Sequence, residues 1–507
     1  MDGALAGALA AGAALAVAEL IAGFFHRQPS LVTGVGQEVI DRAPGAFVRF
    51  GIDKLGHKDK PTLVTGTVVV SLLIGALAGV FARRRRIVGD VVFVAFAVVG
   101  WLAALDAAGS SAAAVTVAAI FAGLIGVFGL RALLWRSARP EPKRVNARAP
   151  QPMSTRRRFL TLSGAVAVGS AFTALIGRAL LDTVSVAAAR AKVILPKARR
   201  TVAPIPRDAS LGIGDVSPLI TPNRDFYRID TVLYVPQVDP EHWTLKVHGR
   251  VNHPYELTFD DVLKMPMVEE YVTLQCVSNV VGGPLVGTAK WLGVPLPTLL
   301  ERADVNPDAD QIVGRSVDDF TVGFPTKTAL DGRTALLAVG MNGEPLPTVH
   351  GFPARLIIAG LYGYVSATKW VTELEATSFA DYDAYWVPRG WSQQGPIKTE
   401  SRIDTPRDSR TVAAGTVPIA GVAWAPTRGI ARVEVQIDRG AWQEAELADE
   451  ITKETWRQWV YRWDAPAGQH EIRVRATDGT GHTQTGVNAD PAPNGATGYH
   501  TIVVSVS

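Results

Sequence analysis

Residues 271–279 read Tyr271-Val272-Thr273-Leu274-Gln275-Cys276-Val277-Ser278-Asn279. The first half of this stretch is rich in β-branched and aromatic residues, which favour a strand, and its second half favours the loop that follows. It contains the only cysteine of the 507-residue chain. A single thiol rules out an internal disulfide, a Cys-x-x-Cys redox pair and a cysteine-ligated iron–sulfur cluster. We therefore expect a β-rich domain that delivers one thiol to a loop.

This stretch resembles the cysteine loop of the sulfite oxidase family of molybdenum enzymes, which has the pattern Thr-Leu-x-Cys-x-x-Asn. The resemblance covers about residues 201–507 and continues in other segments, in the family's order. They are Thr221-Pro-Asn-Arg-Asp-Phe-Tyr-Arg-Ile-Asp230, Trp243-Thr-Leu-Lys-Val-His-Gly-Arg-Val251, Trp291-Leu-Gly-Val-Pro-Leu-Pro-Thr-Leu-Leu300, Met341-Asn-Gly-Glu-Pro-Leu-Pro-Thr-Val-His-Gly-Phe-Pro-Ala-Arg355, Gly360-Leu-Tyr-Gly363 and Lys369-Trp370.

The resemblance implies a mixed α+β domain that binds a molybdenum–molybdopterin cofactor and transfers oxygen atoms. It implies that Cys276 is the metal ligand and that Arg228 belongs to the catalytic centre. A thiolate suits molybdenum because high oxidation states of this metal are held by soft sulfur donors. The residues implied to bind the cofactor are Asn223, Asn279, His350, Arg355 and Lys369.

The same residues also have ordinary interpretations. A lone cysteine is commonly a small buried hydrophobe, and a loop histidine such as His350 is commonly a satisfied polar group. Two other classes of protein therefore stay open: a membrane transporter or sensor with a non-catalytic cofactor-like domain, and a hydrolase that uses His350 with a serine. No Gly-x-Ser-x-Gly elbow, His-Glu-x-x-His helix or phosphate-binding loop supports the hydrolase.

The sequence departs from sulfite-oxidising members of the family at positions that bear on the substrate. Val280 and Val281 follow Asn279 where those members have two arginines, and Val339 stands where they have a tyrosine. An apolar lining accepts a neutral molecule more readily than a doubly charged anion, because an ion is costly to remove from water. We therefore expect the reduction of S-oxides or N-oxides to be favoured over sulfite oxidation, with a sulfite oxidase proper as the alternative.

The N-terminal third of the chain has the composition of a membrane protein. The whole chain is 48% hydrophobic and 19% charged, with a mean hydropathy of +0.16. Stretches of about 20 apolar residues are long enough to cross a bilayer as helices. Five such stretches predict a transmembrane bundle, rich in small residues that suit close helix packing. They are residues 3–25, 63–82, 87–107, 112–134 and 159–181.

The distribution of positive charge predicts the orientation of this bundle. Residues 1–158 contain 19 Lys and Arg but only 9 Asp and Glu, and the basic residues gather at Arg83–Arg86 and in residues 131–158. Basic loops face the cytoplasm, so the N-terminus is expected inside and everything after residue 181 outside. The segment Ser154-Thr-Arg-Arg-Arg-Phe-Leu160 also resembles a twin-arginine export signal. We expect a multi-pass protein of the cell membrane with an extracytoplasmic catalytic domain.

The last hundred residues alternate apolar and polar side chains. Residues 432–438 and 471–478 fit strands of an immunoglobulin-like β-sandwich, and the region resembles the dimerisation domain of the same enzyme family. The chain is thus expected to contain membrane helices in 1–182, a linker in 183–210, an oxidoreductase domain in 211–400 and a dimerisation domain in 401–507.

The expected partners follow from these assignments. They are a small-molecule substrate, a second copy of the chain, and an external electron carrier such as a quinone or a haem protein, since no haem or iron–sulfur site is evident in the sequence. Nucleic acid is not expected, because the basic excess lies beside the membrane helices and the remainder of the chain is mildly acidic.

Overall fold

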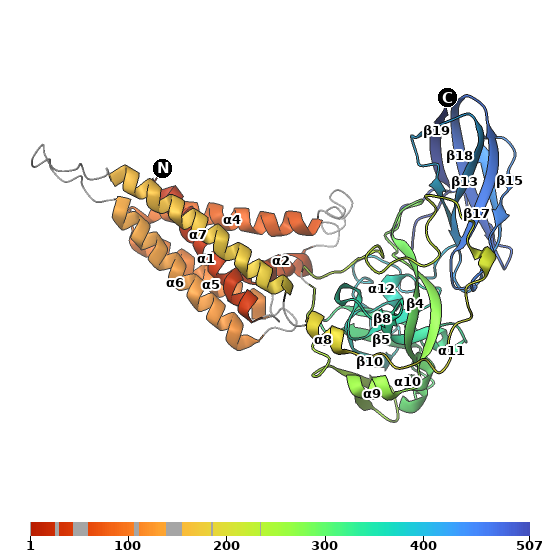
Figure 1. Ribbon diagram of the computed structural model, residues 1–507. Helices are drawn as coiled ribbons and strands as arrows, with labels where there is room; N and C mark the ends of the chain where they lie inside the picture. Colours follow the sequence, from red (N-terminus) through yellow and green to blue (C-terminus); the bar gives the residue numbers. More distant parts are fainter. Residues whose placement is uncertain are drawn as a thin grey trace, which may run out of the picture. The chain divides into compact units, whose positions relative to one another are not determined.

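The computed structural model describes residues 2–25, 30–43, 59–105, 111–137, 155–183, 186–233 and 235–507. The chain folds as two compact units, Met1–Ala188 with Asp230–Gln237, and Ala189–Ile229 with Val238–Ser507. The first unit is helical, and all of the described strands belong to the second (Figure 1). The division separates the apolar N-terminal helices from the β-rich remainder.

Five long helices form most of the helical unit. They are α1 (Asp2–Phe24), α4 (Asp59–Ala82), α5 (Arg86–Leu105), α6 (Ala112–Ser137) and α7 (Thr155–Thr183), with the shorter α2 (Leu31–Arg42) and α8 (Val186–Lys192) in the same part of the chain. Among the described residues, α1, α4, α5 and α6 are long and apolar enough to cross a membrane. The apolar stretch of α7 is shorter, Thr161–Gly177, so the predicted count of five membrane helices is not confirmed.

Small residues bring the backbones of α1 and α4 into close contact. A Cβ atom added at Gly7 would lie 2.0 Å from the carbonyl oxygen of Gly75, and one added at Gly79 would lie 2.1 Å from that of Gly3. Only glycine permits such an approach, which is how helices gain packing contacts where the surrounding lipid is as apolar as the side chains. The prediction of close packing through small residues is confirmed for this pair.

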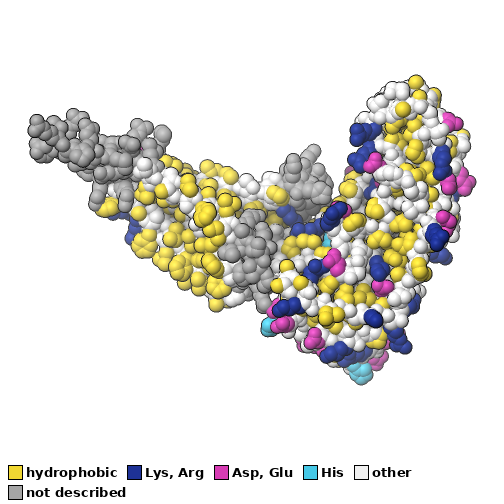
Figure 2. Space-filling view, viewed as in Figure 1, with side chains coloured by type: hydrophobic (Ala, Val, Ile, Leu, Met, Phe, Trp, Pro, Cys, Tyr) yellow, Lys and Arg dark blue, Asp and Glu magenta, His cyan; other side chains and the backbone are white. Residues whose placement is uncertain are grey.

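Large apolar side chains cover the outside of the helical unit. Leu73, Leu77 and Phe81 of α4 are 59%, 58% and 56% exposed, and Ile87 and Val91 of α5 are 65% and 59% exposed. Figure 2 shows apolar side chains gathered over the helical unit, whereas charged side chains are scattered over the other unit. Exposed apolar surface of this extent is unfavourable in water and favourable in a bilayer, which supports membrane association.

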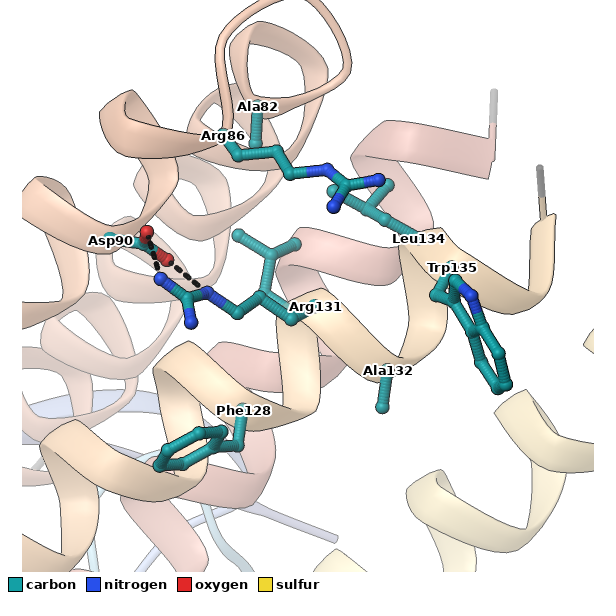
Figure 3. Close-up of a pocket in the computed structure, with 9 residues that line it drawn as sticks. Ala82, Arg86, Asp90, Phe128, Arg131, Ala132, Leu134 and Trp135 are labelled. Carbon is teal, nitrogen blue, oxygen red and sulfur yellow. Dashed lines mark hydrogen bonds and ion pairs between the residues drawn. The ribbon is translucent and has the colours of Figure 1, made fainter.

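An ion pair joins two of the apolar helices in the described part of the chain. Arg131 of α6 donates from Nε and Nη2 to the two carboxylate oxygens of Asp90 of α5, at 3.0 and 2.6 Å (Figure 3). The pair borders a cavity of about 680 Å³ between these helices, whose wall is otherwise largely apolar and includes Phe128 and Trp135. Each charge offsets the cost of placing the other among apolar helices.

The twin-arginine segment is only partly covered by the structure. Ser154 and the side chains of residues 155–160 lie outside the described residues, and the backbone from Thr155 onward belongs to α7. The export function of this segment stays a prediction.

Two sheets form the core of the first part of the second unit. One has the order β2-β1-β10-β5-β6 and the other β3-β4-β7-β8, with β9 also paired to β7. Their strands are β1 (Thr244–Gly249), β2 (Tyr255–Thr258), β3 (Val268–Gln275), β4 (Val286–Pro295), β5 (Gln311–Ser316), β6 (Thr321–Pro325), β7 (Ala335–Met341), β8 (Glu344–Pro345), β9 (Arg355–Ile358) and β10 (Val371–Thr377). Only β1 and β10 run parallel among these pairs.

Short helices close the connections between these strands. They are α9 (Phe259–Lys264), α10 (Leu296–Ala303), α11 (Thr326–Leu330) and α12 (Gly363–Ser366). The helix α9 begins with a capping box, in which the hydroxyl of Thr258 accepts from the amide of Asp261 while the Asp261 carboxylate accepts from the amide of Thr258. These helices and the two sheets give the mixed α+β domain that the resemblance implies.

The C-terminal part is a β-sandwich, as predicted. Its sheets have the orders β11-β13-β17-β16 and β12-β19-β18-β14-β15. The strands are β11 (Glu400–Thr405), β12 (Thr411–Val412), β13 (Gly415–Trp424), β14 (Ile430–Ile437), β15 (Gln443–Glu444), β16 (Glu446–Leu447), β17 (Arg457–Ala465), β18 (Gly468–Asp478) and β19 (His500–Val506). Alternate residues of β18, such as Ile472, Val474 and Ala476, are buried between the sheets.

The sandwich and the α+β domain share one hydrophobic core. Val422, Trp424 and Trp456 of the sandwich region are buried in the same cluster as Leu292 and Val294 of β4. Trp424 is completely buried there. The two domains of this unit are therefore packed as one body rather than joined by a free linker.

Candidate active site

Cys276 directly follows β3, at the start of a loop that returns to β4. We call residues 276–285 the cysteine loop. The amide of Cys276 donates to the carbonyl of Leu285 at 3.0 Å, and the amide of Asn279 donates to the carbonyl of Cys276 at 3.0 Å. The side-chain oxygen of Asn279 accepts from the amide of Leu285 at 2.8 Å, which closes the loop from inside. Cys276 is 8% exposed and is a free thiol.

The environment of the thiol disfavours its charged form. Burial raises the pKa of Cys276, and hydrogen bonds from the backbone and hydroxyl of Ser278 only partly counter this effect. A thiol in such surroundings is protonated at neutral pH unless a cation binds to it. Among the described residues, no three His, Cys, Asp or Glu side chains are grouped to hold a metal ion. A metal at Cys276 would need its other ligands from a cofactor.

Arg355 brings a buried positive charge to the site. Arg355 is the first residue of β9 and is 5% exposed. Its Nη1 donates to the carbonyl of His350 at 3.1 Å, and its guanidinium lies 5.2 Å from the ring centre of Trp291. Its Nε has no hydrogen-bond partner among the described residues, and burial lowers its pKa to about 10. A buried cation with an unused donor is suited to an anionic ligand.

His350 is a neutral donor in this arrangement. Its Nε2 donates to the carbonyl oxygen of Asn223 at 3.0 Å, and the residue is 2% exposed. Burial, and secondarily the charge of Arg355, lower the pKa of His350 to about 4. The ring also meets the edge of Phe226 at 5.6 Å between centroids. His350 thus connects the segment around Asn223 with Arg355 through hydrogen bonds and adds no charge to the site.

Asparagine side chains fix the segment that contains Asn223. Asn342 donates from Nδ2 to the side-chain oxygen of Asn223 at 2.8 Å and to the carbonyl of Thr221 at 2.9 Å. The Nδ2 of Asn223 donates to the carbonyl of Met341 at 3.3 Å. The side chain of Asn223 is therefore engaged within the protein, whereas Nδ2 of Asn279 is buried without a partner among the described residues.

Lys369 and Arg228 lie toward the surface of the site. The Nζ of Lys369 donates to the carbonyl of Ile229, the residue after Arg228, at 3.1 Å. A Cβ added at Gly351, whose φ is +108°, would lie 3.0 Å from Lys369 Cα and 3.1 Å from Arg355 Cβ. Glycine at this turn therefore lets the backbone pass close to both Lys369 and Arg355. Arg228 is exposed over part of its surface, although neighbouring atoms still lower its pKa by desolvation.

Tyr227 lies close enough to Cys276 and Arg355 for both to influence its pKa, and it is not among the predicted site residues. Desolvation and the nearby Cys276 raise the pKa of its phenol, and the charge of Arg355 opposes them. Its ring stacks on Phe226 at 5.2 Å, and Phe226 meets Trp291 at 5.9 Å. The aromatic pair Phe226-Tyr227 beside Arg228 was the only signal in the sequence that would have pointed to it.

The residues that depart from the family pattern occupy different environments. Val280 is 55% exposed on the cysteine loop. Val339 is completely buried in β7, within the hydrophobic core. The structure brings Cys276, Tyr227, Arg355 and His350 together and leaves an apolar side chain at the loop surface.

Comparison with known proteins supports the family resemblance. Residues 232–386 match the oxidoreductase molybdopterin-binding domain, and residues 400–474 match a bacterial Ig domain. The chain is 31% identical over 302 residues to mitochondrial sulfite oxidase of Rattus norvegicus, covering 50% of this chain and 55% of that protein. It is 31% identical over 185 residues to the uncharacterized oxidoreductase YuiH of Bacillus subtilis (strain 168), covering 36% of this chain and 90% of that protein.

A solved structure shares the fold. The sulfane dehydrogenase SoxCD from Paracoccus pantotrophus matches with a TM-score of 0.50 at 23% identity, covering 58% of this chain and 84% of that one. The present chain spans about half the length of the mitochondrial sulfite oxidases that it matches. The two family matches lie between residues 232 and 474.

Proposed function

The chain belongs to the sulfite oxidase family of molybdopterin-dependent oxidoreductases, and we propose that it transfers oxygen atoms to or from a small sulfur- or nitrogen-containing molecule. The observation that carries this proposal is a buried thiol, Cys276, and a buried guanidinium with an unused donor, Arg355, which both act on the same phenol, Tyr227. The transporter, sensor and hydrolase alternatives find no support in these similarities, which are to oxidoreductases.

The residues present fit a molybdenum–molybdopterin cofactor. The cofactor carries a phosphate and a polar pterin edge, which need cationic and neutral hydrogen-bond donors. Arg355 Nε and Asn279 Nδ2 are buried donors without a partner among the described residues, and groups of this kind are rare unless a ligand completes them. The single thiol matches a metal whose other soft ligands come from the pterin dithiolene.

Each side chain has a definite part in this proposal. Cys276 would lose its proton and bind the metal as thiolate, which removes the penalty that burial places on its charged form. Arg355 and Lys369 would hold the phosphate and pterin by charge-assisted hydrogen bonds, with Asn279 as a neutral donor. His350 would hold Asn223 and its segment in place through the carbonyl contact. Arg228 would bind the polar end of the substrate near the surface.

The cofactor, when bound, supplies two-electron oxygen-atom transfer. For a sulfoxide the balanced reaction is reduction by two electrons and two protons to a sulfide and water. We propose this direction, with S-oxides or N-oxides as substrates, because Val280 leaves an apolar surface on the cysteine loop where a sulfite site would need cations. Sulfite oxidation is the second candidate, and the sequence identity to sulfite oxidases favours it.

Steady-state assays in both directions separate the two candidates. A neutral S-oxide or N-oxide with a reduced dye should turn over better than sulfite with an oxidised dye. The double variant Val280→Arg with Val281→Arg should shift the ratio toward sulfite by about one to two decades, since one charge-assisted contact contributes about 1.5 to 3 kcal/mol. Saturating oxidation of sulfite by the unchanged protein, without reduction of any oxide, would overturn the substrate proposal. Absence of molybdenum from the purified protein would overturn the enzyme proposal itself.

We also propose that the apolar helices anchor the enzyme in the cell membrane with its catalytic domain on the extracytoplasmic side. Four helices of sufficient length and the cluster Arg83–Arg86 support this placement. Electrons would then pass to or from a separate carrier, a quinone or a haem protein. A homodimer through the sandwich domain belongs to the same proposal and rests on the resemblance to the family's dimerisation domain.

A further inference from the structure

The C-terminal sandwich touches β3 and the cysteine loop on both sides of Cys276. We propose that this domain is a positioning element of the active site, which fixes the backbone around Cys276 and so sets the direction of its thiol. This inference rests on the proposed function of Cys276 as the metal ligand. The residues of the sandwich that we assign to this task are Glu400, Trp424, Arg402 and His500.

The first contact holds Gln275, the residue immediately before Cys276. Its Nε2 donates to both carboxylate oxygens of Glu400 at 2.9 Å, and its Oε1 accepts from the indole nitrogen of Trp424 at 2.8 Å. Gln275 and Trp424 are completely buried, and Glu400 is 5% exposed. Both polar ends of the amide are thus used, so the side chain has one orientation only.

The two partners of Gln275 form a clamp that the sandwich builds by itself. Glu400 of β11 and Trp424 of β13 lie directly opposite each other in the antiparallel pairing of these strands. Cross-strand neighbours of this kind have fixed spacing, because the ladder of backbone hydrogen bonds sets it. The clamp is therefore made by sheet register rather than by flexible loops, and it acts on the last residue of β3.

The second and third contacts hold the far part of the cysteine loop. Arg402 of β11 donates from Nη1 to the carbonyl of Gly283 at 2.8 Å. The ring of His500 of β19 packs on Gly282, where an added Cβ would lie 2.1 Å from its Cδ2, and His500 Nδ1 accepts from the amide of Ile403 at 3.0 Å. The orientation of this ring is therefore also set by the sandwich backbone.

These contacts lie on both sides of Cys276: at Gln275, one residue before it, and at Gly282 and Gly283, six and seven residues after it. The strand is held once more at Thr273, whose amide donates to the carbonyl of Glu454 at 2.9 Å and whose hydroxyl accepts from the amide of Trp456 at 2.8 Å. A ligand atom that must keep a fixed direction benefits from such support, since misplacement by about 1 Å can cost about 100-fold in rate. The distribution of the contacts favours positioning over general adhesion of the two domains.

The test compares variants that cut one positioning contact with a variant elsewhere on the same domain. Trp424→Phe removes the indole donor to Gln275 and keeps most of the packing. Arg402→Met removes the donor to Gly283, together with the bonds of Arg402 to Asp404 and Ser217. The control is Arg462→Gln, which removes an exposed ion pair with Glu446 in the same sheet. All are made in the full chain, and if one positioning variant fails to fold, the other still tests the inference.

Four quantities are measured: molybdenum content, the Mo(V) electron paramagnetic resonance signal, kcat with KM, and the rate of Cys276 alkylation in cofactor-free full-length protein. Both positioning variants should shift the resonance signal, lower kcat about 10- to 100-fold with little change in KM, and speed alkylation about 10-fold or more. The control should match the unchanged protein in all four.

An unaltered signal, kcat and alkylation rate in both variants, with only a lower melting temperature, would show that the sandwich is merely a packed neighbour and would overturn the inference. The alkylation assay needs no cofactor. If the purified protein proves to contain no molybdenum, the proposed function fails, whereas the alkylation rates still decide whether the sandwich positions Cys276.

Discussion

At the scale of single residues, the site depends on burying groups that prefer water. The Cys276 thiol and the Arg355 guanidinium are both almost inaccessible to solvent. Burial raises the pKa of Cys276 and lowers the pKa of Arg355, so it favours the uncharged form of each group. Both penalties are relieved when a metal meets the thiol and an anion meets the guanidinium. The same two residues that destabilise the empty fold are therefore those that gain most from a bound cofactor.

Cys276→Ala should leave a folded protein that does not turn over. Loss of one buried sulfur costs about 1 kcal/mol, which lowers the melting temperature by a few degrees. Loss of the thiolate should lower turnover by at least about 100-fold while the pterin contacts keep part of the cofactor bound. Unfolding, metal content and turnover are measured together, with Ser278→Ala as a variant that keeps the thiol. Full activity of Cys276→Ala would remove this residue from the metal.

Glu400 should make stability depend on pH. Burial raises its pKa from the usual 4.5 to about 7, while its bonds to Gln275 and Tyr362 and the charge of Lys398 oppose the rise. The folded protein thus holds the proton more tightly than the unfolded chain. The contribution to stability is complete below pH 4.5, is lost as the pH rises toward 7, and amounts to about 3 kcal/mol.

Thermal unfolding from pH 5 to pH 8 checks this prediction. Glu400→Gln cannot ionise, so the loss of stability with rising pH should be smaller in this variant than in the unchanged protein. Glu446→Gln, an exposed carboxyl in the same domain, serves as the control. Parallel pH profiles for Glu400→Gln and the unchanged protein would contradict the expected titration.

The sequence was informative at this scale only where residues of one site are close along the chain. Cys276, His350 and Arg355 could be proposed because each stands inside a short recognisable segment. The partners of Gln275 could not, since Glu400 and Trp424 lie 125 and 149 residues away and belong to another domain. The periodicity of a strand can predict that a glutamate is buried, but it does not predict which distant residue the glutamate contacts.

At the scale of elements, the conformation of the cysteine loop is set at Gly282. Its φ is +76°, a backbone region that L-residues rarely adopt, and the His500 ring occupies the space where a Cβ would lie. The loop therefore depends both on a backbone conformation that glycine adopts without strain and on close approach by the sandwich.

Gly282→Ala should disturb the site more than backbone strain alone predicts. Gly481→Ala is the matched control, because φ there is +85° and no atom lies within 4 Å of the added Cβ. The control should lose about 1 kcal/mol of stability from strain. Gly282→Ala should lose more than this and also lose molybdenum, measured by thermal unfolding and metal analysis. Equal losses of stability, with metal content unchanged in both, would show that the His500 contact has no role.

Helices were easier to predict from the sequence than the way they pack. Long apolar stretches identified α1, α4, α5 and α6 within a few residues, because membrane spans need both length and hydropathy. The helix α2, only 12 residues long and capped at Ser30, was not predicted. Its apolar stretch is too short to be recognised as a membrane-spanning helix, so nothing in the sequence distinguished it from a loop.

At the scale of the whole molecule, the order of apolar helices, α+β domain and sandwich could be predicted, because composition and hydrophobic period change along the chain. The shared core of the last two domains could not be predicted. The sequence around Trp424 and Trp456 would look the same if these side chains filled the interior of an isolated sandwich. Only side-chain contacts show that they pack against the other domain.

The orientation of the molecule in the membrane can be tested with single cysteines, because the one native thiol is buried. In a Cys276→Ala background, Arg84→Cys places an exposed thiol in the basic loop and Ser505→Cys places one on β19. The asymmetry of Lys and Arg predicts that a membrane-impermeant maleimide labels the Ser505→Cys variant in intact cells and the Arg84→Cys variant only after lysis.

The same assay decides whether the twin-arginine segment exports the catalytic unit. Arg156→Lys with Arg157→Lys keeps the positive charge, so the positive-inside effect is unchanged, but it removes the arginine pair that an export receptor would read. In the Ser505→Cys protein this change should abolish labelling in intact cells while labelling after lysis persists. If the β19 thiol is still labelled from outside, charge asymmetry alone orients the chain and the arginine pair is an ordinary part of the basic loop.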